Sequence, residues 1–176
     1  MHELTGVTVQ LGREQRLAGG HWLLGAAPSL EEARATWEES GSAWLRPGVL
    51  FGAVAVRASV VHAALGMDSP IGCAPLVDVG GPVFYSDEGF GREGAYTALV
   101  PASVALVWSV NGSLPHHRRA LLEVPAPQVV MPERAGRPWW VVPLDGPGLL
   151  CDPDLLADLV KEGTGTPGDA EGGPGA

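Results

Sequence analysis

The sequence contains little cysteine and no long apolar run. Its two cysteines, Cys73 and Cys151, form no C-x-x-C pair, so we expect two free thiols rather than a disulfide framework. No apolar stretch approaches the roughly 18 residues of a membrane-spanning helix, and no charged segment followed by an apolar run opens the chain. We therefore expect a protein that is located in the reducing cytoplasm and does not associate with a membrane.

Positive charge is scarce as well. One lysine and ten arginines oppose 20 acidic residues, which gives a net charge of −9. Six of the acids follow residue 151, where a single lysine opposes them, so a charge of −4 remains for the first 151 residues. A protein that binds phosphate backbones usually presents a basic face, and none is evident in this sequence. The charge therefore favours a protein partner, of unknown identity, over nucleic acid.

Glycine and proline are abundant, with 25 and 16 residues, while hydrophobic residues make up 45% of the chain and the mean hydropathy is +0.13. This composition is typical of a folded domain with short elements and many turns. We predict a single domain over residues 1–163. Residues 164–176 contain no apolar residue larger than alanine, so we predict a disordered, acidic tail rich in glycine and proline.

Local patterns predict helices at four places. Ser29 and Glu32 can form a capping box, and the helix that they begin ends at Gly41, a residue suited to the left-handed closing position. Its apolar face comprises Leu30, Ala33 and Trp37. Three further helices are predicted over residues 59–65, with Ser59 as the cap, 101–108, and 152–163, where Asp152 and Pro153 suit the first two positions and Gly163 the end.

Residues 1–20 carry no clear pattern and are predicted to form a peripheral segment. Short apolar runs bounded by turn residues predict strands at residues 21–27, 44–45, 49–57, 83–85, 95–100, 120–124 and 139–142. The runs at 83–85 and 95–100 are joined by a polar turn that contains glycine, which indicates an antiparallel pair. These elements predict an α/β protein, α+β in detail, in which helices pack on a small mixed or antiparallel sheet.

Three stretches carry a family resemblance: GPVFYSDEGFGREGAYTALVPASVALVW from Gly81, RRALLEVPAP from Arg118, and GRPWWVVPL from Gly136. They read as a hairpin, a glycine-containing turn, a short helix, a strand ending in Pro-x-Pro and an aromatic strand. This order resembles the N-terminal domain of bifunctional DNA primase/polymerases, the prim-pol branch of the archaeo-eukaryotic primase superfamily. The resemblance covers residues 22–144 and implies the fold of that family and a link to replication.

The resemblance also implies where the catalytic groups of such an enzyme belong. The family holds divalent metal ions on carboxylates in a hydrophobic-Asp-hydrophobic-Asp/Glu strand, and the matching segment here, residues 50–57, reads LFGAVAVR without an acid. Tyr96 stands where the family's nucleotide-binding histidine is expected, and the strand that ends at Pro127 begins without an acid. We therefore expect a catalytically degenerate domain, with no catalytic residue, metal or cofactor, that acts as a binding or regulatory module.

The candidate binding residues are His116, His117, Arg118, Arg119 and Trp140. The two histidines and two arginines are adjacent and can meet phosphate or another anion, although neighbouring residues of a strand point to opposite faces and rarely bind one ion. By the same alternation, one of the two tryptophans at 139 and 140 is expected in the core and the other at an exposed, partner-binding surface. The other four tryptophans, Trp22, Trp37, Trp44 and Trp108, are expected in the core.

Two alternative functions remain open at this point. In the first, a diverged primase/polymerase still binds nucleotide and metal through relocated acids such as Asp78, Asp87 and Glu88. In the second, the domain is a protein-interaction scaffold unrelated to nucleic acid. The G-x-G-x-x-G pattern from Gly89 to Gly94 is expected to be a hairpin turn, because a strand rather than a helix follows it. His62 is expected in the core or at its boundary.

Overall fold

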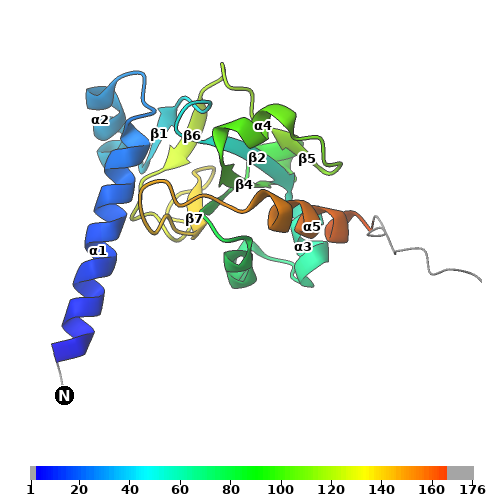
Figure 1. Cartoon of the computed structure of the whole chain (residues 1–176), viewed down its shortest axis with the longest axis horizontal. Coiled ribbons are helices and arrows are strands. Elements are labelled where there is room, and N and C mark those ends of the chain that lie inside the picture. Colours follow the sequence, from blue (N-terminus) through cyan, green and yellow to red (C-terminus); the bar gives the residue numbers. More distant parts are fainter. Residues whose placement is uncertain (1–2, 166–176) are drawn as a thin grey trace, which may run out of the picture.

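A five-stranded antiparallel sheet lies at the centre of the molecule, in the order β5-β2-β4-β3-β7. Its strands are β2 (Gly52–Arg57), β3 (Val83–Ser86), β4 (Ala95–Val100), β5 (Ser113–Pro115) and β7 (Trp139–Val142). A separate antiparallel pair joins β1 (Ser42–Leu45) to β6 (Leu122–Pro125). The computed structural model describes the backbone of residues 3–165 and the side chains from residue 12 onward (Figure 1).

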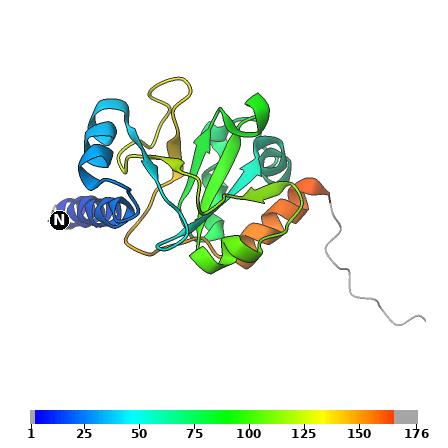
Figure 2. The same ribbon diagram turned by 90° about the horizontal axis from the view of Figure 1, so that it is seen from above.

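In the described part of the chain, five α-helices surround these sheets: α1 (Glu3–Leu24), α2 (Leu30–Ser40), α3 (Ala58–Leu65), α4 (Ala102–Val107) and α5 (Pro153–Thr164). The same residues include the short 3-10 segments η1 (Pro70–Gly72), η2 (Ala74–Val79) and η3 (Gly89–Arg92). Helices α1 and α2 lie at one end of the molecule beside β1, whereas α3, α4 and α5 lie at the other (Figures 1 and 2). The predicted α+β class is confirmed.

Two predictions for the first 27 residues are wrong. Residues 1–20 were predicted as a peripheral segment and 21–27 as a strand, but residues 3–24 form the single long helix α1. Its glycines hide the helix from sequence reasoning because glycine lowers helix propensity. Two of them lie against other parts of the domain, since a Cβ on Gly19 would lie 2.9 Å from Leu144 Cδ2 and one on Gly20 would lie 2.7 Å from Pro127 Cγ. The C-terminal part of α1 therefore packs closely on the domain.

The helix predicted from the capping box is confirmed. The Ser29 side chain accepts a hydrogen bond from the Glu32 amide, and Gly41, at φ 77°, donates its amide to the Trp37 carbonyl. Ala33 and Trp37 are buried, but Leu30 is 49% exposed and does not belong to the buried face. The predicted start of α5 is also confirmed, because Asp152 accepts bonds from the amides of Asp154 and Leu155.

Two helix ends differ from the prediction. Ser59 does not cap α3, which begins at Ala58 after Arg57, and its hydroxyl bonds to the Glu93 carboxylate instead. Helix α5 continues through Gly163 to Thr164 and ends at Gly165, where φ is 65°. The tail predicted to be disordered thus falls, from residue 166 onward, outside the described residues. None of the helices in the described part of the chain is both long and apolar enough to span a bilayer.

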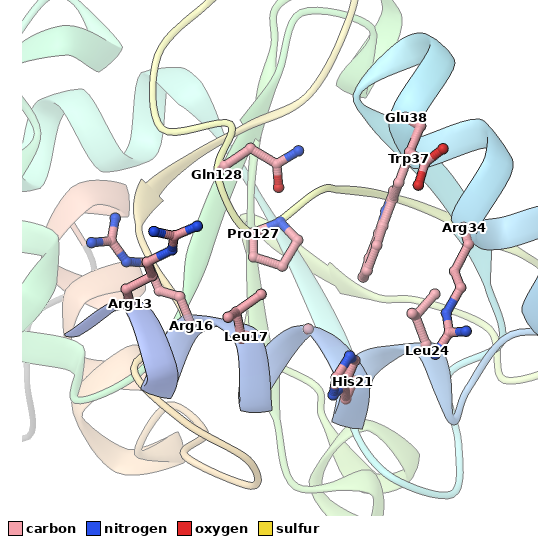
Figure 3. A pocket seen from close by; sticks show the side chains of 11 residues that line it. Arg13, Arg16, Leu17, His21, Leu24, Arg34, Trp37, Glu38, Pro127 and Gln128 are labelled. Atoms are coloured by element: carbon pink, nitrogen blue, oxygen red, sulfur yellow. The ribbon is translucent and has the colours of Figure 1, made fainter. Parts of the chain in front are cut away.

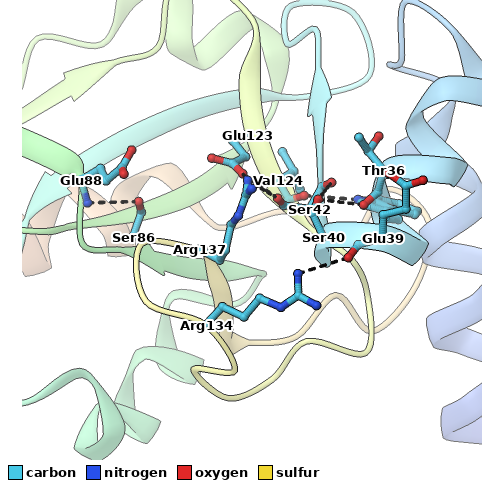
Figure 4. A network of polar contacts seen from close by, with 11 residues as sticks. Thr36, Glu39, Ser40, Ser42, Ser86, Glu88, Glu123, Val124, Arg134 and Arg137 are labelled. Carbon is cyan, nitrogen blue, oxygen red and sulfur yellow. Dashed lines mark hydrogen bonds and ion pairs between the residues drawn. The ribbon is translucent and has the colours of Figure 1, made fainter.

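A polar network ties the loop between β6 and β7 to the end of the molecule that carries α2 (Figure 4). Arg137 Nη1 donates to Glu123 Oε1 at 2.6 Å and to Ser42 Oγ at 3.4 Å, while Arg134 Nη1 donates to the Glu39 carbonyl at 3.2 Å. Glu123 has only 18% of its side chain exposed, so the ion pair with Arg137 is partly shielded from solvent. This network holds the loop that supplies Pro127 to the surface beside α1 and α2.

Candidate functional site

The candidate residues at 116–119 lie in the loop between β5 and β6. The His116 amide donates to the Ala53 carbonyl at 2.8 Å, which anchors the start of the loop to β2. The ring of His116 lies 3.2 Å from the Ala120 carbonyl, and His117 Nδ1 accepts from the Arg119 amide at 3.2 Å. One ring nitrogen of each histidine is therefore engaged within the loop, which helps to hold the loop together.

Arg118 and Arg119 line one hollow together with Arg46, which follows β1. This hollow, which we call the arginine hollow, has a volume of about 520 Å³ and is walled by residues 25–28 on one side and 47–50 on the other. The Arg46 amide donates to the Ala26 carbonyl at 2.8 Å and so joins the two walls. Gly48, at φ 114°, leaves the space that Arg118 occupies, since a Cβ on Gly48 would lie 2.8 Å from the Arg118 Cβ.

The arginine hollow is positively charged although the protein as a whole is acidic. All three arginines are exposed, and no aspartate or glutamate is among the described residues that line the hollow. Within the described part of the chain, the arginines that form ion pairs are Arg57 and Arg137, not those of the hollow. A smaller neighbouring hollow of about 260 Å³ is lined by His116, His117 and Arg118. The loop therefore presents cationic groups to solvent that the protein does not neutralise.

Trp140 is not part of this surface, and its prediction as a binding residue is wrong. Both tryptophans of β7 are buried, with Trp139 7% and Trp140 1% exposed, because both faces of the sheet are covered at this strand. Trp140 Nε1 donates to the carbonyls of Pro125 and Ala126 at 3.2 Å, and its ring meets Phe84 edge-on at 5.4 Å. The exposed tryptophan is Trp44, at 53%, which was expected in the core.

The acids considered for a relocated metal site do not belong to a cluster of three or more metal-binding side chains among the described residues. Asp78 lies in η2, Asp87 and Glu88 lie after β3, and all three are exposed. Among the described residues, no group of three histidine, cysteine or acidic side chains is placed to hold a metal ion. A site that combines Asp78 or Asp87 with two further protein ligands is therefore not found in that part of the chain.

The positions at which the resemblance places catalytic groups are filled by core side chains. Ala53, Val54 and Val56 of β2 are at most 1% exposed, and so is Tyr96 of β4. The Tyr96 hydroxyl lies 2.8 Å from His62 Nε2 and 3.2 Å from Cys73 Sγ, so the three side chains form a small polar cluster. Sequence reasoning missed this cluster. The one signal for it in the sequence is His62, a histidine within the otherwise apolar helix α3.

Comparison with protein-family models, curated proteins and solved structures finds no match for this chain.

Burial keeps both thiols protonated. It raises the pKa of Cys73, an effect that the hydrogen bond with Tyr96 partly offsets, and it raises the pKa of Cys151 to about 12. Burial, followed by the interaction with Cys73, also raises the pKa of the Tyr96 hydroxyl. A neutral thiol is a poor nucleophile.

These pKa values predict a loss of stability in alkali. In the unfolded chain Cys151 ionises near 9.0, whereas in the folded protein its pKa is about 12. Because the unfolded state releases its proton first, the stabilisation is fully present below pH 9 and is lost as the pH rises toward 12. We expect the urea midpoint to fall between pH 8 and pH 10.5, and to fall less steeply in Cys151→Ala. Equal slopes in the two proteins would contradict the assignment to this thiol.

Proposed function

We propose that this chain is a non-catalytic, prim-pol-like module of the cytoplasm that binds an acidic segment of a protein partner in the arginine hollow. The observation that carries the proposal is the convergence of Arg46, Arg118 and Arg119 on one concave surface that no acid lines among the described residues. Arginine presents a planar fork of donors that matches a carboxylate in a bidentate manner. The link to replication rests on the family resemblance alone.

The packing of the central strands supports the non-catalytic part of the proposal. A metal site for nucleotidyl transfer needs hard oxygen ligands, whereas the corresponding positions of β2 carry alanine and valine that are buried in the core. Introducing a carboxylate there would place an unpaired charge among apolar side chains, which is strongly unfavourable. The scaffold is thus better suited to present its loops than to bind metal at the centre of the sheet.

The overall charge favours an acidic protein segment over nucleic acid as the occupant. Three arginines at one hollow can pair with a few carboxylates, but a net charge of −9 repels a long polyanion along the rest of the surface. The hollow is also bounded by glycine, alanine and proline at residues 25–28, so an extended peptide backbone can approach closely. The binding is expected to weaken with salt, since the arginines are exposed.

We expect the double variant Arg118→Gln/Arg119→Gln to bind a fluorescein-labelled peptide that carries three glutamates among neutral residues at least tenfold more weakly than the wild type. A charge-assisted hydrogen bond contributes about 1.5–3 kcal/mol, and 1.4 kcal/mol corresponds to a factor of ten. Fluorescence anisotropy at low salt measures the affinity. Arg92→Gln, which removes an exposed arginine outside the hollow, is the matched control and is expected to bind like the wild type.

Two further titrations decide between this proposal and its rivals. An oligothymidine of ten nucleotides is expected to bind more weakly than the peptide; tighter binding that the double variant abolishes would replace the protein partner with nucleic acid. Nucleoside triphosphate with Mg²⁺ or Mn²⁺ is expected to leave the melting temperature unchanged. A shift that depends on the metal would overturn the non-catalytic part of the proposal, because a ligand that binds only the folded state stabilises it.

A further inference from the structure

A second hollow lies between α1 and α2, away from the residues of the arginine hollow. We call it the helix groove; it has a volume of about 550 Å³ and is completed by Pro127 and Gln128 of the loop after β6 (Figure 3). Gly20 allows α1 to approach this loop, since a Cβ there would lie 2.7 Å from Pro127 Cγ. A volume of this size suits a small organic molecule, for which pockets range from about 300 to 1,000 Å³.

The floor of the helix groove is apolar. It is lined by Leu17 and Leu24 of α1, Trp37 of α2 and Pro127, and Figure 3 shows Trp37 extending from α2 toward the side on which Leu17 and Pro127 lie. Trp37 Nε1 donates to the Val124 carbonyl at 3.2 Å, which fixes the ring in place. Leu17 is 56% exposed although it borders this apolar floor. An apolar ligand would remove this leucine from water.

Cationic side chains stand at both ends of the groove. Arg13 and Arg16 extend from α1 at one end, and Arg34 of α2 lies at the other, beside Leu24 (Figure 3). All three are exposed, and none forms an ion pair with an acid whose side chain the structure describes. Arg16 Nε donates to the Gly12 carbonyl at 3.1 Å, which leaves its terminal nitrogens for other partners. Glu38 is the one acid among the described residues that line the groove.

We infer that the helix groove binds a small organic anion, one with an apolar body that lies on Trp37, Leu17 and Pro127 and an acidic group that pairs with the arginines. The apolar floor alone would suit a neutral molecule, and the arginines alone would suit an inorganic anion. Together they select a molecule that carries both features, since each guanidinium can form a charge-assisted hydrogen bond with a sulfonate, carboxylate or phosphate. Among the residues that the structure describes, this site shares no lining residue with the arginine hollow, and it does not depend on the proposed function.

The test uses the fluorescent dye 1-anilinonaphthalene-8-sulfonate, which carries an aromatic body and one sulfonate. We expect the full-length protein to bind one molecule with saturation. The double variant Arg13→Gln/Arg34→Gln is expected to bind about tenfold or more weakly, as loss of a charge-assisted bond predicts. Leu17→Glu, which places an acid on the apolar floor, is expected to abolish the saturable signal. Circular dichroism melting confirms that each variant is folded before titration.

Matched controls separate this site from general dye binding. Leu155→Glu introduces the same change at a leucine of α5 that is 48% exposed and lies outside the groove, and it is expected to bind the dye like the wild type. Arg118→Gln/Arg119→Gln is also expected to leave dye binding unchanged, so the two sites can fail independently. Wild-type affinity in both groove variants would overturn the inference. The inference would also be overturned if the neutral dye Nile red bound as tightly as the sulfonate dye. It would be overturned as well if the groove variants weakened the binding of a labelled acidic peptide but not that of the sulfonate dye.

Discussion

Replacing Trp140 with alanine is expected to lower the free energy of unfolding by about 3–5 kcal/mol, the usual cost of truncating a buried tryptophan. The ring is 1% exposed and packs edge-on against Phe84. Its removal also leaves the carbonyls of Pro125 and Ala126 without their donor in the core. Domains of this kind are stabilised by only about 5–15 kcal/mol, so the loss is a large share of the total. Urea unfolding followed by far-ultraviolet circular dichroism measures it.

Trp44→Ala is the matched control for this prediction. Trp44 lies in β1, faces solvent with 53% of its surface, and pairs across the strand with Glu123. Surface substitutions of this kind usually change stability by no more than about 0.5 kcal/mol. Trp140→Phe is expected to fall between the two, because it keeps an aromatic ring but removes the N–H donor. Equal effects at positions 44 and 140 would contradict the burial of Trp140.

The second large effect is expected from adding a single methyl group at Gly163. This residue lies in α5 where it crosses α3, and a Cβ there would lie 2.7 Å from the carbonyl carbon of Val60 and closer still to its oxygen. Gly163→Ala is therefore expected to force the two helices apart and to cost about 1–3 kcal/mol or more, as overpacking does. The sign of the change in the free energy of unfolding is informative, because alanine is otherwise favoured over glycine in a helix by about 1 kcal/mol.

Gly12→Ala tests the same substitution where there is space. Among the described atoms, a Cβ at Gly12 of α1 would meet only Arg16 Nη2, at 4.0 Å, so this variant is expected to be as stable as the wild type or more so. The double variant Val60→Ala/Gly163→Ala is expected to remain destabilised, because the clash involves the backbone of Val60 rather than its side chain alone. Wild-type stability of Gly163→Ala in urea unfolding would contradict the close approach of α3 and α5.

Predictions that depend on hydrogen bonds between near neighbours were the reliable ones. Ser29 and Gly41 bound α2, and Asp152 begins α5, because each cap satisfies amides or carbonyls within a few residues of itself. The β3–β4 pair follows the same logic, since a short turn joins two apolar runs. Ser59 shows the limit: its hydroxyl bonds to Glu93, which is 34 residues away, in place of the local cap that the pattern favoured.

The candidate site was only half visible in the sequence. Arg118 and Arg119 were evident as adjacent cations, but Arg46, which completes the arginine hollow, comes from a loop more than 70 residues earlier. The helix groove was not visible at all, because α1 lacks the amphipathic pattern that announces a helix. One end of α1 is held where Gly19 and Gly20 pack against Leu144 and Pro127. No single segment of the sequence encodes this complementarity of shape.

By itself, the sequence determined the α+β class, both caps of α2 and the first cap of α5, the β3–β4 pair and the absence of acids from β2, since these follow from local hydrogen bonding and from residue identity. Only the tertiary structure decided that Trp140 is buried while Trp44 is exposed, that residues 3–24 form a helix, and which arginines meet. The physical reason is that burial and convergence depend on what covers each face of a sheet or helix. The covering segments come from distant parts of the chain.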